Sequence, residues 1–401
     1  MKDVRVVVGG FLGLWPAGGP TWDYVQYPLG LAELGADVYY VEDTRLWPVY
    51  RADAAEDPSA RPNVEHLAKV MEFFGLGDRW AYRDEISGEW FGMSGSKVAG
   101  ICRTADVLVN VSCSIYMRDE YRRIPVRILI DSDPMFTQIQ YAAASRLGGI
   151  PGEPGLREML EAHTHHFSFG EHIGAEDCRV PTSGITWRPT RQPICLDWWP
   201  VTPLPEGPEA AYTTVMNWTN TTPLEWNGDT WGQKDVEMLR FQAVPSLVRP
   251  LPIAVAVGQS TESPFPTEEF EKNGWRVLDP AVHAPEWVSY REFIGSSLGE
   301  FAIAKETYVK ALTGWFSCRA ACYLAAGRPV VNQDTGWSRH LPAGEGLLAF
   351  DDVDGAVAAL REVASDPGRH ARAARRIAEE CFDARAVLTD LLERAGTKGR
   401  P

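Results

Sequence analysis

Short apolar runs alternate with segments of helical periodicity along almost the whole chain, and this alternation is the strongest constraint on the fold. Val4–Val8 and Asp37–Val41 read as strands, and Trp22–Leu34 between them has the apolar spacing of a helix. Further strands are expected at 106–111, 126–130 and 165–169, and a helix is expected at 64–74. Strands separated by helices predict an α/β fold with a parallel, doubly wound sheet.

A chain of 401 residues is too long for one ordinary hydrophobic core, so two domains are expected. Residues 200–208 are the most proline-dense stretch, and because proline favours extended backbone, this stretch is interpreted as a linker. The alternation then resumes, with strands expected at 212–216, 252–257, 275–278, 301–304 and 346–350, and helices at 235–241, 266–273, 285–294, 355–360 and 371–380. The segment Asp78–Ser96 fits no clean period and is interpreted as an insertion near the cleft between the domains.

The stretch Gly314–Gly336 predicts a helix, a tight turn, a buried strand and a polar loop. Ala320–Ala326 is rich in helix formers, Gly327 is placed to end the helix, and Pro329 begins an extended run. The loop that follows lies at the carboxyl end of the expected strand, where ligands bind in open parallel sheets. We therefore expect a ligand site here.

This stretch resembles the donor-binding half of GT-B glycosyltransferases, which carry the pattern R, two residues, E-A-L-A-x-G-x-P-V-V, then D-x-G. The matching residues are Arg319, Leu324, Ala325, Gly327, Pro329, Val330, Val331, Asp334 and Gly336. The resemblance implies two Rossmann-like domains facing across a cleft: an acceptor-binding domain at 1–199, a linker at 200–209, a nucleotide-sugar-binding domain at 210–382, and a crossover helix and tail at 383–401. The helix expected at 384–395 would cross back onto the first domain.

The sequence departs from the family pattern at two positions. Many of these enzymes carry a helix glutamate that holds the nucleotide ribose, and this chain has Cys322 there. The paired upstream glutamate position falls on Gly314. We therefore expect the sugar donor to be recognised differently in detail.

A glycine-rich loop follows the first strand and opens a helix. Glycines allow close backbone approach, and a helix N-terminus offers free amides to anions. By the resemblance, Gly18, Gly19 and Asp23 would face the cleft. Asp23 is a candidate catalytic base, and capping of the first helical turn is the alternative.

Three cations follow expected strand ends in the second half: Lys234, Lys305 and Arg319. By the resemblance, Lys234 lies where an ammonium neutralises the leaving diphosphate, and transfer from a nucleoside diphosphate builds such negative charge. Ser317 is expected to contact phosphate or ribose, or to cap a helix. The resemblance places Asp334, Thr335 and Gly336 at the donor-sugar hydroxyls, and Asp-x-Gly is also a common turn.

His172, in a loop expected at the cleft, is the second candidate for the base that deprotonates the acceptor. Asp131 and Asp133 end another strand, but their spacing does not separate catalysis from loop structure. The cluster His163–His166 would need a defined third ligand to hold zinc, and alternation along a strand splits its side chains between two faces. No metal and no cofactor is expected beyond a nucleoside-diphosphate sugar as co-substrate.

The composition of the chain indicates which classes of partner are expected. The formal net charge is −15, and no long basic block is present, so nucleic acid is not expected. The chain begins with a strand instead of an export signal and has no apolar run of about 18 residues, so a soluble, cytoplasmic protein is expected. Several of the 15 tryptophans, such as Trp15 and Trp22, fall in or beside loops. They would bind a flat acceptor or fill the seam between domains.

The sequence therefore predicts a metal-independent glycosyltransferase that moves a sugar from a nucleoside-diphosphate sugar to a small-molecule acceptor, a natural product or an envelope precursor. Two alternatives stay open. One is another GT-B nucleotide-sugar enzyme, such as an epimerase or an enzyme of S- or N-linked conjugation. The other is a non-catalytic nucleotide-sugar-binding protein. Retention or inversion at the sugar, and a homodimer, are also left open.

Overall fold

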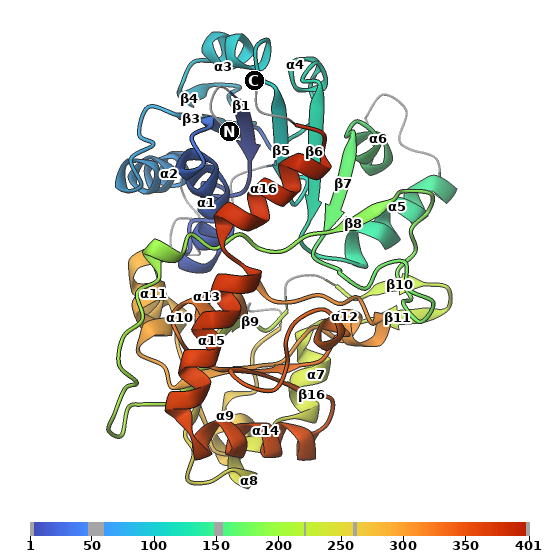
Figure 1. The fold of residues 1–401 in the computed structure, drawn as a ribbon. Helices are drawn as coiled ribbons and strands as arrows, with labels where there is room; N and C mark the ends of the chain where they lie inside the picture. Colours follow the sequence, from blue (N-terminus) through green and yellow to red (C-terminus); the bar gives the residue numbers. More distant parts are fainter. Residues whose placement is uncertain (1–3, 47–59, 148–154, 220–221, 260–262, 398–401) are drawn as a thin grey trace.

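The computed structural model describes residues 4–46, 60–147, 155–219, 222–259 and 263–397 and builds them around two separate sheets (Figure 1). The first sheet is made by residues of the N-terminal half and the second by residues of the C-terminal half. Within the described residues, none of the helices combines the length and apolar composition that crossing a membrane requires.

The N-terminal sheet has eight strands in the order β4-β3-β2-β1-β5-β6-β7-β8. They are β1 (Arg5–Gly9), β2 (Asp37–Glu42), β3 (Trp80–Arg83), β4 (Trp90–Gly92), β5 (Val107–Val111), β6 (Val126–Asp131), β7 (His165–Ser168) and β8 (Trp187–Pro189). The helices of this half are α1 (Gly18–Glu33), α2 (Arg61–Phe73), α3 (Gly95–Cys102), α4 (Asp119–Arg122), α5 (Phe136–Leu147) and α6 (Leu156–Glu161). All neighbouring strands are parallel except β3 and β4, which pair antiparallel.

The C-terminal sheet has six parallel strands in the order β13-β12-β9-β14-β15-β16. They are β9 (Tyr212–Asn217), β12 (Ile253–Gly258), β13 (Trp275–Leu278), β14 (Gly299–Ala302), β15 (Val330–Gln333) and β16 (Leu347–Phe350). Its helices are α7 (Lys234–Arg240), α8 (Val244–Leu247), α9 (Thr267–Lys272), α10 (Pro280–His283), α11 (Trp287–Gly295), α12 (Glu306–Ala311), α13 (Cys318–Ala325) and α14 (Val353–Ser365). A separate hairpin pairs β10 (Leu224–Trp226) with β11 (Asp229–Trp231).

Each sheet begins in its middle, at β1 and at β9, and the chain then winds to one side and returns to the other. This is the doubly wound arrangement that the alternation of strands and helices predicts, and the α/β fold class is confirmed. The central strands consist largely of β-branched residues because both of their faces are covered; every residue of β5 is buried.

The interpretation of Asp78–Ser96 as an insertion is wrong. This segment supplies β3 and β4, which form one edge of the N-terminal sheet. Trp80, Ala81 and Tyr82 are buried there. Strands of four and three residues are too short to show a period in the sequence.

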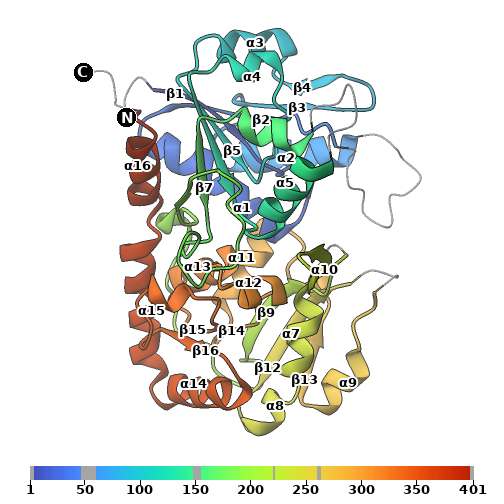
Figure 2. The same cartoon turned by 90° about the vertical axis from the view of Figure 1, so that its right-hand side faces the viewer.

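The two last helices run along one side of the molecule and span both halves (Figure 2). The first, α15 (Pro367–Cys381), packs on α13, and the second, α16 (Ala384–Arg394), packs on α1. A Cβ atom on Gly30 of α1 would lie 2.7 Å from Leu388 Cδ1, so only glycine admits α16 this closely. The expected crossing of the last helix onto the first half is confirmed; the exact domain boundaries stay a prediction.

The chain passes between the halves twice, and the two passages are hydrogen-bonded to each other. Ile194 donates its amide to the carbonyl of Phe382 at 2.7 Å, and Ala384 donates to the carbonyl of Ile194 at 2.9 Å. Arg375 Nη1 donates to the carbonyl of Trp199 at 2.9 Å. The first passage therefore lies against the second.

A second contact between the halves depends on Gly314. Its backbone has φ +74°, and a Cβ atom there would lie 2.5 Å from the backbone nitrogen of His172. That nitrogen donates to the carbonyl of Thr313 at 3.1 Å. A side chain at position 314 would thus meet both backbone strain and a collision with the other half.

We expect Gly314→Ala to lower the free energy of unfolding more than Gly174→Ala does. Gly174 also has positive φ, +94°, but a Cβ atom there meets nothing within 4 Å. Strain alone should cost about 1 kcal/mol, and the collision should add about 1–3 kcal/mol. Urea unfolding of both variants measures the difference; equal losses would contradict the close approach.

Candidate functional site

The carboxyl ends of the two sheets face each other, and the loops that follow these ends are in contact. Trp315 Nε1, just before α13, donates to the carbonyl of Ser132, just after β6, at 2.9 Å. Lys305, which precedes α12, forms an ion pair with Asp133 at 2.8 Å. Ligands bind open parallel sheets at these ends, beside the strand where the winding reverses.

The structure brings the three predicted cations together. Lys234, at the start of α7, is 9% exposed, and its ammonium has no hydrogen bond or ion pair among the described residues. Burial lowers the pKa of Lys234 well below its ordinary value, and the nearby charges of Arg319 and Lys305 lower it further. A neighbouring anion would favour the charged form of Lys234, as opposite charges do.

Arg319 is fixed by contacts with two strands of the C-terminal sheet, β14 and β9. Its Nε is paired with the carboxylate of Glu300 in β14, which is fully buried, and its Nη1 donates to the carbonyl of Val215 at 2.6 Å. The second carboxylate oxygen of Glu300 is buried without a hydrogen bond in the described structure. Arg319 is therefore a fixed charge at the start of α13.

Ser317 is the N-cap residue of α13 and is 5% exposed, but its side chain makes no capping hydrogen bond. Its hydroxyl has no other partner in the part of the chain that the structure describes. The first amides of α13 and this hydroxyl lie beside Arg319, a combination that suits a phosphate or a ribose.

Asp23 approaches this group from α1 of the other half. Burial raises its pKa to about 7, with Arg319 lowering it and Asp133 raising it. Its carboxylate accepts no hydrogen bond from any residue that the structure describes. The N-cap of α1 is Ala17, so Asp23 does not cap this helix and is left facing the second half.

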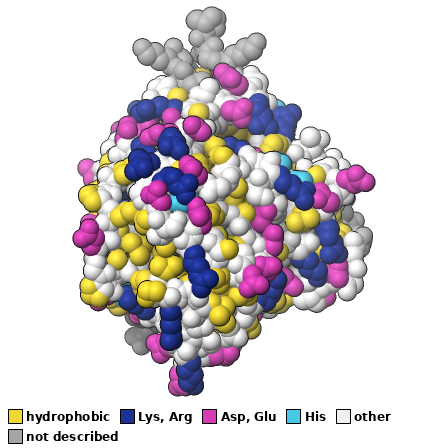
Figure 3. All heavy atoms as spheres, turned by 60° about the horizontal axis from the view of Figure 1, so that its bottom comes forward, with side chains coloured by type: hydrophobic (Ala, Val, Ile, Leu, Met, Phe, Trp, Pro, Cys, Tyr) yellow, Lys and Arg dark blue, Asp and Glu magenta, His cyan; other side chains and the backbone are white. Residues whose placement is uncertain are grey.

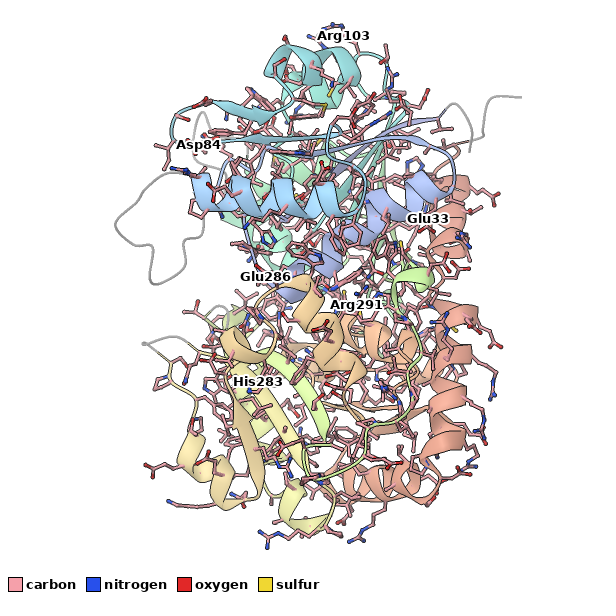
Figure 4. All side chains as sticks on the ribbon, turned by 90° about the vertical axis from the view of Figure 1, so that its left-hand side faces the viewer. Glu33, Asp84, Arg103, His283, Glu286 and Arg291 are labelled. Carbon is pink, nitrogen blue, oxygen red and sulfur yellow. The ribbon has the colours of Figure 1, made fainter. Side chains whose placement is uncertain are left out.

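Gly18 and Gly19 pack against the second half. A Cβ atom on Gly18 would lie 2.7 Å from the carbonyl oxygen of Glu286 and 2.6 Å from Cβ of Tyr290, and Gly19 borders the same tyrosine ring. Figure 4 shows Glu286 at the boundary between the two halves. That these glycines contact the sugar donor stays a prediction. In the structure, the two glycines allow α1 to pack closely on α11.

Both ring nitrogens of His172 are engaged at the seam. Nε2 lies 2.7 Å from Asp177 and 2.9 Å from Arg339, and Nδ1 lies 3.1 Å from His340. Arg339 also pairs with Asp177 at 2.7 Å. The side chain of His172 is buried, so it joins the halves in place of facing an open cleft.

Asp334, Thr335 and Gly336 build a turn. Asp334 accepts the amide of Gly336 at 2.8 Å and the hydroxyl of Ser338, and Gly336 has φ +94°. The Thr335 hydroxyl donates to the carbonyl of Trp315 at 2.7 Å. This turn supports the start of α13; the predicted contacts with sugar hydroxyls stay untested.

The spacing of Asp131 and Asp133 in the sequence does not distinguish their roles, but the structure does. Asp131 accepts from Thr137, Gln138 and Ser168 within its own half and is buried. Asp133 faces the second half and pairs with Lys305. The role of Glu300 was not predicted; a single acid inside an otherwise apolar strand was the available signal.

An aromatic cluster is formed by Phe11, Trp15 and Tyr24, the last of which follows Asp23 in the chain. The rings of Phe11 and Trp15 are 4.4 Å apart, and those of Phe11 and Tyr24 are 5.6 Å apart. Trp15 is 38% exposed, whereas Trp22 and most other large rings are buried. The Tyr24 hydroxyl donates to Ser112 at 3.2 Å. Ser112 has φ +57°, a strained conformation of the kind that gathers at functional sites.

Two other features of the structure were possible sites, and neither of them gathers unpaired polar side chains among the described residues. A cavity of about 460 Å³ lies at the opposite end of the N-terminal sheet, beside Asp37 and Arg79, far from the facing carboxyl ends. His163 and His166 bond to the carbonyls of Met159 and Leu160 at 2.9 and 2.8 Å. Among the described residues, no group of three or more His, Cys, Asp or Glu side chains is arranged to hold a metal ion.

Solved structures match this architecture over nearly the whole chain. An alpha-glucosyltransferase in complex with UDP and a 13-mer DNA containing an HMU base has a TM-score of 0.57, 12% identity and coverage of 99% of this chain and 100% of that one. A glycosyltransferase involved in avilamycin A biosynthesis has a TM-score of 0.53 and 11% identity, with 98% and 97% covered. Sucrose-phosphate synthase from Thermosynechococcus elongatus has a TM-score of 0.51 and 10% identity, with 98% of both chains covered.

The chain has the GT-B fold. This confirms the fold that the Gly314–Gly336 pattern implies. No model of a known protein family matches the chain, and no curated protein sequence matches it significantly. At this identity the structures share the GT-B fold, and the chemistry of this chain depends on its own residues.

The Asp23 carboxyl should titrate near pH 7. Since its pKa is raised, it stays protonated at pH 5 and is ionised at pH 8. NMR of protein labelled with 13C at the aspartate carboxyls measures this, with Asp23→Asn identifying the signal. Asp177 is the contrast, because its hydrogen bonds from Arg339 and His172 lower its pKa to about 2. An Asp23 midpoint near 4 would contradict the burial of this carboxyl.

Proposed function

We propose that the protein is a glycosyltransferase that transfers a sugar from a nucleoside-diphosphate sugar to a small-molecule acceptor. One observation carries the proposal: Asp23, Lys234 and Ser317 are buried or half-buried between the facing carboxyl ends of the two sheets, and their polar atoms have no partner among the described residues. Buried polar groups are normally hydrogen-bonded, so three that converge without partners suit an external polar ligand.

The charges around them favour a diphosphate as the donor's leaving group. Lys234 gains a counter-charge on binding it, and Arg319 and the first amides of α13 are already fixed beside it. Groups that are fixed before the reaction stabilise the charge that develops on the phosphate without reorganisation. The Ser317 hydroxyl, at the start of α13, would donate a hydrogen bond to an oxygen of the same group.

In the proposed reaction, the bond between the sugar's anomeric carbon and the phosphate oxygen breaks, and the acceptor oxygen bonds to that carbon. The acceptor's proton passes to Asp23, whose pKa of about 7 suits a base at neutral pH. Asp23 is preferred to His172 because both nitrogens of His172 are already engaged. The electron pair of the broken bond stays on the diphosphate.

The acceptor is proposed to be a small molecule with an apolar, planar part. Trp15 offers an exposed ring that packs on Phe11 and Tyr24, the residue that follows Asp23, and such a ring suits an apolar, planar face. A polynucleotide is disfavoured by the net charge of −15. On the face shown in Figure 3, basic and acidic side chains are interspersed instead of forming a basic band.

Nucleoside diphosphates should raise the melting temperature of the wild-type protein, since a ligand at about 100 times its Kd adds about 2.7 kcal/mol to the stability of the folded state. Lys234→Ala should weaken binding of the best diphosphate about 10- to 100-fold, because a charge-assisted hydrogen bond is lost. Thermal shift identifies the base, and isothermal titration calorimetry measures Kd.

Lys272→Ala is the matched control, since Lys272 is an exposed lysine of the same half, far from the sheet ends. It should leave the Kd unchanged. If no diphosphate shifts the wild type at millimolar concentration, the donor site is refuted. If the diphosphate binds but labelled sugar is never transferred or released in the presence of aromatic alcohols, the protein binds donors without catalysis.

A further inference from the structure

Lys305 is the one cation of the three that is paired with an acid of the opposite half. Its Nζ lies 2.8 Å from Asp133 Oδ1, and its side chain is 18% exposed. Lys234 has no partner in the described structure, and Arg319 pairs within its own half with Glu300. The acid on Lys305 therefore comes from the acceptor side of the proposed reaction.

The Asp133 carboxylate accepts hydrogen bonds from two side chains of the C-terminal half. The Tyr308 hydroxyl donates to the same oxygen as Lys305, and the Tyr308 ring lies 4.3 Å from that of Trp315, which bonds the neighbouring Ser132. The Lys305 ammonium also lies 4.8 Å from the centre of the Phe136 ring, which belongs to the N-terminal half. Burial alone would raise the pKa of Asp133, but Lys305 and the hydrogen bonds lower it, so the carboxylate is charged at neutral pH.

Two of the three cations are already paired without a ligand. Glu300 offsets Arg319 and Asp133 offsets Lys305, whereas Lys234 forms no ion pair among the described residues. A diphosphate brings roughly two or three negative charges to the same cations. Lys305 is near enough to Lys234 to lower its pKa, so an anion on Lys234 would also be attracted to Lys305 and repelled by Asp133.

We propose that Asp133 competes with the donor diphosphate for Lys305, so that an acid of the acceptor half limits how tightly the donor half binds its nucleotide. This inference rests on the proposed function. By linkage, whatever draws Asp133 away from Lys305 strengthens donor binding by the same factor by which the donor loosens the Asp133 contact. An acceptor that binds beside Asp133 would thus act on the donor's affinity.

The test compares Asp133→Asn with Asp177→Asn. Both remove a half-exposed acid that pairs with a cation across the seam, at 2.8 Å to Lys305 and 2.7 Å to Arg339, but only Asp133 pairs with a proposed donor cation. With UDP as the probe, or the nucleoside diphosphate that gives the largest thermal shift, we expect Asp133→Asn to lower Kd about tenfold, within the range of coupling between sites. Asp177→Asn should leave the Kd within about twofold of the wild type.

Tyr308→Phe is a second variant that weakens the Asp133 contact without changing Asp133 itself. It keeps the aromatic ring and removes the hydroxyl that holds Asp133, so it should tighten UDP binding in the same direction but less strongly. If the wild type binds no diphosphate, the proposed function fails. If the wild type binds and Lys234→Ala weakens binding, yet Asp133→Asn binds no tighter, the function stands and the competition is refuted. Equal tightening by Asp133→Asn and Asp177→Asn would also refute it, because general loosening of the seam would then explain both.

Discussion

Burying a charge is costly unless it is paired, and this cost organises the contact between the halves. Arg319 meets the fully buried Glu300 within one half, and Lys305 meets the half-exposed Asp133 across the two. Each pairing fixes geometry as well as charge. What the pairings leave over, an acid on one side and an ammonium on the other, defines where a polar ligand fits.

Most of the fold could be predicted because apolar periodicity survives in single segments. The central strands and most of the long helices are visible in a local run, as for Val4–Val8 and the helix expected at 384–395, but the 12-residue helix α5 was not predicted. The edge of the N-terminal sheet could not be predicted. Its strands β3 and β4 have four and three residues, and they are stabilised by neighbouring strands that the local sequence does not reveal. The hairpin of β10 and β11 was missed for the same reason.

The sequence predicted which cations gather at the strand ends, but it could not predict their partners. The rule that ligands bind at carboxyl ends selected Lys234, Lys305 and Arg319, and these three lie near one another in the structure; their role in donor binding stays a prediction. The rule could not show that Lys305 meets Asp133, because these residues are 172 positions apart and belong to different sheets. The same rule could not show that the ring nitrogens of His172 contact Arg339 and His340, which are 167 and 168 positions away. Partners depend on tertiary packing, whereas strand ends depend on local sequence.

The paired passages of the chain between the halves have a mechanical consequence. Two connections lie side by side and bond to each other, at Ile194 and Phe382, so the covalent links between the halves are gathered at one place. Everything else that joins the halves is non-covalent, including the buried side chains of Trp22 and Trp287, the Trp315–Ser132 hydrogen bond and the Lys305–Asp133 ion pair. The relative placement of the two sheets is therefore set by side-chain packing and polar pairs, and substitutions at these contacts would alter it without touching either sheet.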